Sequence, residues 1–251
     1  MKRIINLAAL LFLGTGFALG QTYVIRPNMG PSILLGDLGG NFEQAKLNVT
    51  DYDWRSTRFQ IGGDFLWGLG KSKGRFSLPN NYLVLAVNFS RLHASDLESY
   101  NQNKVRRGLV SDVTCFEANT LFEKQFSPAN LRPNSKHFFI PMIFVGVGVK
   151  YASPKITEKG DTKYTENIGN SVSAQFPYGV GLDYQLAKNQ RLGLQFYSVR
   201  STTDLVDGIN KQGNPDNLDN HIFLKITYSA LLEKVKGGLF PFKRNNTCPR
   251  F

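Results

Sequence analysis

The chain has 251 residues, a formal net charge of +11 at pH 7 and a mean hydropathy of −0.24. That hydropathy excludes a helical membrane protein, but it allows a β-barrel, in which only every second strand residue contacts lipid. The basic excess comes without a nucleic-acid recognition motif, so we expect no nucleic-acid partner and attribute the charge to anionic lipid or an acidic protein partner.

The N-terminal residues 1–20 have the pattern of a secretory signal peptide. Two basic residues are followed by an apolar run, and Ala18-Leu19-Gly20 forms a small-x-small cleavage site before Gln21. Residue 21 is not cysteine, which disfavours a lipoprotein, and no later stretch has the roughly 18 apolar residues that a spanning helix needs. We therefore expect an exported chain in which residues 21–232 form one all-β domain and residues 233–251 form a basic tail.

Alternation of apolar with small or polar residues predicts strands along the rest of the chain. In residues 139–151, for example, three valines and a tyrosine share one face, opposite two glycines and a lysine. A face of glycine and charged residues packs poorly in a soluble core but suits the lumen of a narrow transmembrane barrel, whose outside is apolar and aromatic. The predicted strands are Ser32–Gly39, Arg58–Trp67, Tyr82–Leu92, Val113–Glu123, Phe139–Tyr151, Val172–Leu186, Arg191–Arg200 and His221–Leu232.

Long and short connections alternate between these strands. The long ones are residues 41–56, 95–111, 152–171 and 201–219. The short ones are residues 68–80, 126–136 and 187–190. A barrel shows this alternation when one rim faces the outside and the other faces the periplasm. The sequence therefore predicts a transmembrane antiparallel up-and-down β-barrel of the Gram-negative outer membrane. It has eight strands, long extracellular loops, and both termini, including the C-terminal tail, in the periplasm.

Charged residues on the predicted lumen face are expected to form a structural ion network. They are Arg58, Asp64, Glu117, Glu123, Lys150, Asp183 and Lys225. The interior of an eight-stranded barrel is just filled by side chains, and buried charges there must be paired. The same filling argues against a pore for solutes. The Gly-Val-Gly sequences at 146–148 and 179–181 follow strand alternation rather than a nucleotide-binding motif, and such glycines let long side chains cross the lumen.

Catalytic and metal-binding arrangements have weaker support. His93 lies three residues before Asp96, but no positioned nucleophile accompanies the pair. Four aspartates between residues 204 and 219 miss the order of a calcium loop, so turn and capping roles are the simpler interpretation. Cys115 and Cys248 are too few for a disulfide scaffold, and the sequence leaves open whether they are bonded. We expect no catalytic residues, no cofactor and no metal site.

Five segments in sequence order resemble one known family. They are Ser32–Gly40, Lys104–Phe126, Ile140–Lys155, Gln175–Leu186 and Ser201–Ile209. With the tail that ends in Cys-Pro-Arg-Phe, they are similar to the PorG-type outer-membrane barrels of the type IX secretion system. The most specific part is the loop with Thr203, Asp204 and Asp207, which resembles the TDY-x-D-D element of that family. Here Leu205 stands in place of the usual Tyr and Gly208 in place of a second Asp, which leaves open a sister family with a different function.

The resemblance implies a non-enzymatic barrel that anchors a periplasmic ring of PorK-like and PorN-like proteins to outer-membrane lipid. The tail would contribute basic side chains to that contact, namely Lys234, Lys236, Lys243, Arg244 and Arg250. The alternative is an autonomous small barrel of the OmpX or OmpW kind, which binds extracellular ligands or passes small apolar molecules. In that case the long loops matter for function and the tail does not.

Overall fold

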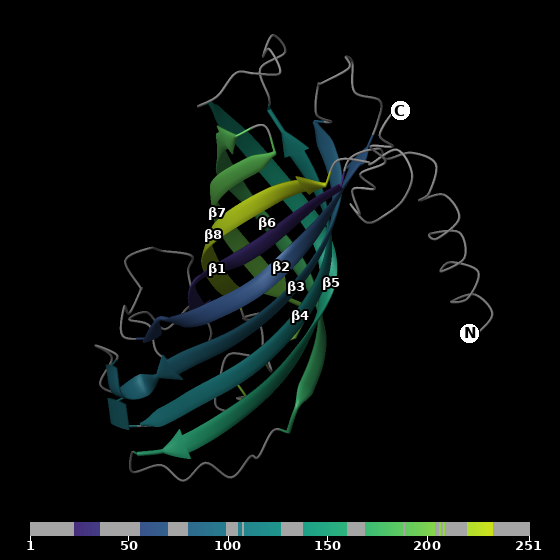
Figure 1. Cartoon of the computed structure of the whole chain (residues 1–251). Coiled ribbons are helices and arrows are strands. Elements are labelled where there is room, and N and C mark those ends of the chain that lie inside the picture. Colours follow the sequence, from purple (N-terminus) through teal and green to yellow (C-terminus); the bar gives the residue numbers. More distant parts are fainter. Residues whose placement is uncertain are drawn as a thin grey trace, which may run out of the picture.

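The computed structural model describes residues 23–35, 56–69, 80–98, 105–106, 108–126, 138–159, 169–187, 189–203, 206, 208 and 220–232. These residues form a closed antiparallel barrel of eight strands (Figure 1). The strands are β1 (Tyr23–Leu35), β2 (Arg58–Leu69), β3 (Asn81–Ser95), β4 (Leu109–Gln125), β5 (Phe139–Glu158), β6 (Ser171–Ala187), β7 (Gln190–Ser201) and β8 (Asn220–Leu232). Each strand pairs with its neighbours in the sequence, and β8 pairs with β1. The predicted up-and-down barrel with eight strands is confirmed.

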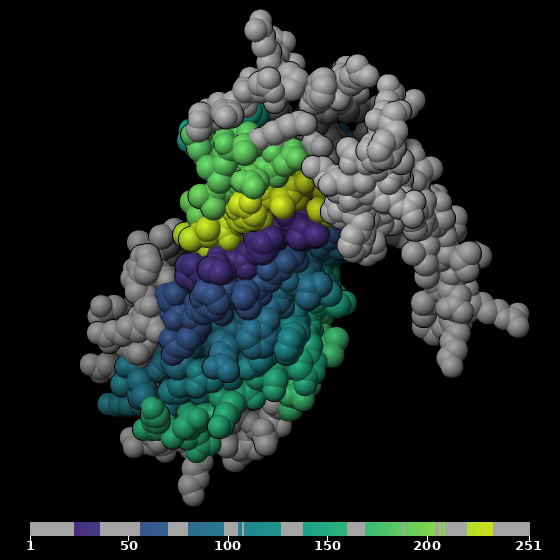
Figure 2. Space-filling model, viewed as in Figure 1, coloured from purple at the N-terminus to yellow at the C-terminus, as the bar shows by residue number. Residues whose placement is uncertain are grey.

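The barrel wall is apolar on its outside. Every strand carries large exposed hydrophobic side chains, which alternate with residues that face the lumen. Val147 in β5, for example, is 58% exposed. Figure 2 shows this wall as slanted bands that lie side by side in chain order, with β8 (yellow) against β1 (purple). An apolar surface that encircles the fold is typical of a barrel that crosses a bilayer. Within the described residues, no helix combines the length and hydropathy that a membrane-spanning helix needs.

Two ends of the barrel are distinguished by their connections. At the end that we call the loop rim, residues 36–57, 96–108, 159–170 and 202–219 link the strands. At the opposite turn rim, β1 begins, β8 ends, and residues 70–80, 126–138 and 188–189 link the strands. Outward aromatic pairs lie at this rim: the ring of Tyr23 stacks on that of Phe65, and the rings of Phe139 and Tyr184 lie 5.0 Å apart. Aromatic girdles of this kind mark the interfaces of transmembrane barrels.

The first strand is longer at its start than predicted. The predicted strand began at Ser32, because Pro27 and Pro31 interrupt the preceding segment. In the structure, both prolines lie in β1 and face the outside, and both retain register partners in β2, namely Gly63 and Phe59. The register with β8 has gaps at these two positions. Proline has no N–H to donate to a neighbouring strand, so β1 accommodates the prolines by losing pairing on one side only.

Two central strands also extend further than predicted, both at the loop rim. β4 begins at Leu109 rather than Val113, and β5 ends at Glu158 rather than Tyr151. The predicted loops 95–111 and 152–171 are therefore partly strand, and the connections 96–108 and 126–138 have equal lengths although they lie at opposite rims. The difference in length between the connections of the two rims is thus smaller than predicted. The predicted signal peptide and tail lie outside the described residues.

Candidate functional site

The lumen holds a buried arginine that bridges two carboxylates. Arg26 projects inward from β1 and is 1% exposed. Its Nε lies 2.9 Å from Asp64 Oδ2 of β2, and its Nη2 lies 2.7 Å from Glu123 Oε2 of β4. A second bond from Nη1 to Glu123 Oε1, at 3.2 Å, makes the contact with Glu123 bidentate. Since β1 and β4 are not neighbours in the sheet, this contact crosses the lumen.

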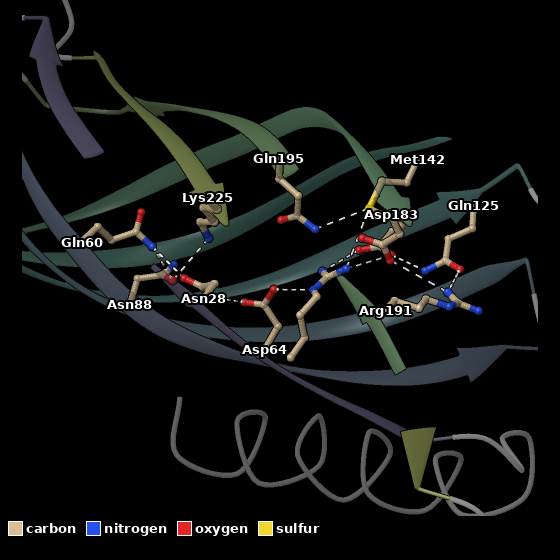
Figure 3. A network of polar contacts seen from close by, with 12 residues as sticks. Asn28, Gln60, Asp64, Asn88, Gln125, Met142, Asp183, Arg191, Gln195 and Lys225 are labelled. Atoms are coloured by element: carbon tan, nitrogen blue, oxygen red, sulfur yellow. Dashed lines mark hydrogen bonds and ion pairs between the residues drawn. The ribbon is translucent and has the colours of Figure 1, made fainter. Parts of the chain in front are cut away.

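Polar side chains extend this cluster toward the loop rim. Asn28 donates to Asp64 Oδ1 at 3.0 Å, and Gln60 donates to both Asn28 and Asn88 at 3.0 Å. Lys225 of β8 donates to Asn88 Oδ1 of β3 at 3.3 Å. Figure 3 shows these side chains, contributed by separate strands, converging inside the barrel. The contact between Lys225 and Asn88 again joins strands that are not neighbours, so it also spans the lumen.

On the side of the turn rim, a second arginine continues the network. Gln125 donates to Glu123 Oε1 at 2.7 Å and accepts from Arg191 Nη1 at 2.8 Å (Figure 3). Arg191 also donates through Nε to Gln185 at 2.8 Å, and its Nη1 lies 3.9 Å from Asp183 Oδ2. Residues of β4, β6 and β7 are thereby linked across the lumen near this rim.

A separate ion cluster lies nearer the loop rim. Glu117 Oε1 of β4 lies 2.8 Å from His221 Nε2 of β8 and 3.7 Å from Lys150 Nζ of β5. Lys150 Nζ lies 2.6 Å from His221 Nδ1 and donates to Ser201 Oγ at 3.3 Å. All four side chains are buried. A serine, a lysine, a histidine and a glutamate in contact are the residue types of a hydrolase, but complete burial leaves a substrate no access to them.

Aromatic rings and glycines fill the space between the two ion clusters. Lys225 Nζ lies 3.8 Å from the ring centroid of Tyr197, and the rings of Phe144 and Phe223 pack on Tyr197 at 5.2 and 5.8 Å. Gly179 lies under Phe144: a Cβ there would come within 2.5 Å of the Phe144 ring. The inward glycines of β5 and β6 therefore leave room for inward side chains of the adjacent strands, such as Phe144 and Asn119.

The network fills the interior of the barrel with polar side chains, and the buried carboxylates and cations on its strands are equal in number. Four buried carboxylates (Asp64, Glu117, Glu123 and Asp183) and four buried cations (Arg26, Lys150, Arg191 and Lys225) lie on the described strands. Contacts between strands that are not neighbours cross the interior at several levels, among them Arg26 with Glu123, Lys225 with Asn88 and Arg191 with Gln125. This is the behaviour expected of an eight-stranded barrel, whose interior is just wide enough for its own side chains.

The structure places the sequence-predicted residues as follows. Six of them are buried in the lumen, and each belongs to one of the two clusters: Asp64, Glu117, Glu123, Lys150, Asp183 and Lys225. Arg58 is half-buried at the start of β2, where its Nη1 donates to the Thr57 carbonyl at 2.9 Å. Thr203 is described just beyond β7. Asp204, Asp207, the five basic tail residues and Cys248 lie outside the described residues, whereas Cys115 is buried.

Sequence reasoning missed three members of the network. Arg26 lay in a segment that was not predicted as a strand, and Arg191 was adjacent to a predicted turn. His221 begins a predicted strand but was not recognised as a partner of Glu117. Predicting a strand from Tyr23 onward in spite of Pro27 and Pro31 would have placed Arg26 in the lumen. In the structure, Val24, Arg26 and Asn28 share the inward face of β1.

At the loop rim, the predicted histidine–aspartate pair takes a different form. His93 Nδ1 of β3 lies 2.7 Å from Asp112 Oδ1 of β4, whereas the carboxylate of Asp96 accepts from the Leu109 backbone N–H at 3.4 Å. The partner of His93 is therefore Asp112 rather than the nearby Asp96, because β4 starts early enough to place Asp112 opposite His93. Among the residues that the structure describes, no three His, Cys, Asp or Glu side chains gather into a metal site.

Three strands project past the rest of the barrel at this rim. The described pairing of β3 with β2 ends at Ser90, and that of β5 with β6 ends at Ala152. Beyond these points β3, β4 and β5 continue as a sheet that we call the projecting sheet (residues 91–95, 109–114 and 153–158). Its inner face is apolar, and Val206, from the connection between β7 and β8, is buried in the same cluster.

No protein-family model and no curated protein matches this sequence. Among solved structures, the chain is similar to the neisserial surface protein A, with 12% identity, a TM-score of 0.43, and coverage of 85% of this chain and 98% of that chain. It is also similar to Ail of Yersinia pestis (9% identity, TM-score 0.42, coverage 85% and 100%). A third is the outer membrane protein OprG of Pseudomonas aeruginosa (10% identity, TM-score 0.37, coverage 86% and 97%). At these identities the likeness concerns the fold alone.

Proposed function

We propose that this protein is a small, closed outer-membrane barrel that acts as a binding scaffold at the loop rim. The contact between Arg26 and Glu123 carries this proposal, since its two charged hydrogen bonds join strands that are not neighbours across the lumen and so argue against passage of solutes. The apolar outer wall supports a membrane location. We place the loop rim outside the cell and the termini in the periplasm, and we assign the barrel no catalytic activity.

The projecting sheet supports a binding surface at the loop rim rather than at the turn rim. It extends the wall past the barrel by a sheet of three strands, whose inner face joins the apolar cluster of the barrel together with Val206. Gly208, with φ +85°, lies against Pro154 and Ile156 of β5. A rigid sheet that projects from a membrane offers a surface for a partner, and the closed lumen leaves binding rather than passage as the function of this end.

A second candidate function is anchoring of a type IX secretion ring. The resemblance of five segments to PorG-type barrels and the tail, with five basic residues against Glu233 alone, support it. In this case the partner would be a periplasmic ring of PorK-like and PorN-like proteins, and the tail would contact it.

One pulldown from native membranes distinguishes the two candidates. Three tagged forms are compared: the full chain, the chain cut after Leu232, and a chain in which residues 160–168 and 209–219 are replaced by glycine and serine. Rim binding predicts that specific partners are lost only from the replaced form. Ring anchoring predicts that ring proteins are lost only from the cut form. If all three correctly inserted forms bring down no partner, both candidates fail.

A further inference from the structure

The outside of β3, β4 and β5 changes character in three steps toward the loop rim. Paired residues across the three strands form rows on the same outward face. The rows are Val87–Ala118–Val149, then Phe89–Phe116–Tyr151, then Arg91–Thr114–Ser153, and finally His93–Asp112–Lys155. The wall thus passes from an aliphatic to an aromatic row, then to a row with one cation and two hydroxyls, and last to a row of three ionisable side chains.

The aromatic row fixes the depth of the membrane at this side. The rings of Phe89 and Phe116 lie 4.9 Å apart, and Tyr151 is the register partner of Phe116. Aromatic residues gather at the headgroup level of barrels, with the apolar band between the two girdles. Successive outward residues of a strand lie about 7 Å apart. The two polar rows therefore lie within and just above the headgroup layer, and they face the lipid rather than the lumen.

The two polar rows present a mixed set of groups. Arg91 and Lys155 are exposed, while Thr114 and Ser153 are half-exposed. Asp112 is 62% exposed although it contacts His93. The strand spacing of about 4.8 Å and the offset of two residues place the Cα atoms of Arg91 and Lys155 roughly 12 Å apart. That separation suits two phosphate groups on one headgroup better than a single phosphate. The accessible carboxylate between the two cations would repel a bare phosphate, but it can accept hydrogen bonds from sugar hydroxyls.

We propose that this outward face of β3, β4 and β5 binds the headgroup of a phosphorylated glycolipid in the leaflet at the loop rim. Arg91 and Lys155 bind separate phosphates, and Thr114, Ser153 and Asp112 bind sugar hydroxyls. His93 positions the carboxylate of Asp112. This inference rests on the proposed placement of the barrel in the outer membrane, where it would bind the lipid that surrounds the projecting sheet.

The test measures lipid binding to the full-length protein, purified in detergent, by native mass spectrometry. The probes are a diphosphorylated disaccharide glycolipid, phosphatidylglycerol and inorganic pyrophosphate. We expect the glycolipid to bind most tightly. Arg91→Gln and Lys155→Gln each weaken it about five-fold, the effect of one surface cation near an anionic headgroup. Lys124→Gln is the matched control, because Lys124 is an exposed lysine near the turn rim, and it leaves binding unchanged.

Several results would overturn the inference. Equal binding by Arg91→Gln, Lys155→Gln and Lys124→Gln would show that the two cations do not form a site. Equal affinity for phosphatidylglycerol would reduce the face to a general anionic-lipid contact, and equal affinity for pyrophosphate would exclude a role for the sugar. A separate readout is the heat-dependent gel mobility of the barrel after insertion into vesicles. Failure to insert refutes the proposed membrane function, whereas normal insertion with unselective binding refutes only the glycolipid site.

Discussion

Replacing Arg26 with methionine tests whether the lumen network stabilises the barrel. Methionine retains most of the apolar volume but leaves Asp64 and Glu123 without their shared cation, and both side chains are almost fully buried. Removing one partner of a buried ion pair costs about 3–5 kcal/mol, because the remaining charge stays desolvated. We therefore expect the free energy of unfolding to fall by about that amount.

The assay is urea unfolding of the refolded barrel in lipid vesicles, followed by tryptophan fluorescence. Arg58→Met is the matched control, since Arg58 is only half-buried at the start of β2. We expect a smaller loss than for Arg26→Met, because solvent near Arg58 can hydrate the groups that lose their partner. The triple variant Arg26→Met, Asp64→Asn, Glu123→Gln removes all three charges and should recover most of the loss. If Arg26→Met costs no more than Arg58→Met, the network does not hold the lumen together.

Three further substitutions probe other parts of the account. Gly179→Ala brings a Cβ against the Phe196 carbonyl oxygen of β7 and to within 2.5 Å of the Phe144 ring, so urea unfolding should show a loss of about 1–3 kcal/mol. Gly63→Ala, where the added methyl meets open space, should change little, and equal effects would show that the lumen glycines are not close-packed. Val147→Arg puts a charge in the middle of the outward face of β5 and should cost about 2–4 kcal/mol in vesicles; a loss under about 0.5 kcal/mol would place Val147 outside the lipid. Gly208→Ala forces a side chain into the left-handed region and against Pro154, and we expect faster proteolysis at the loop rim with unchanged barrel unfolding; unchanged proteolysis would mean that Gly208 does not hold the connection in place.

The barrel was predictable from the sequence because its outward face is simple. Valines, leucines and aromatic residues recur at every second position of β6 and of residues 145–151 of β5, mostly opposite glycine and polar residues, and this pattern needs no long-range information. The start of β1 was not predictable in the same way. Pro27 and Pro31 carry a local signal against strand structure, which is overcome by pairing with β2 on one side.

The charged residues of the lumen were predictable as a set, but their partners were not. Alternation places Asp64, Glu117 and Lys225 inward, whereas the partner of Glu123 is Arg26, which lies 97 positions away in the sequence. Such a contact depends on how the barrel closes and on the stagger of its strands, which no single segment determines. The projecting sheet was missed for a related reason: Pro154 and Lys155 ended the apolar alternation of β5, although pairing with β4 continues to Glu158.

Recording current across a planar lipid bilayer tests the closed lumen most directly. The wild-type protein is inserted from detergent, and its insertion is verified by the heat-dependent gel mobility of the recovered protein. We predict no stepwise conductance, because the contacts of Arg26 with Glu123 and of Lys225 with Asn88 span the interior. Stable, reproducible conductance steps from correctly inserted wild-type barrels would contradict the account and identify the protein as a channel.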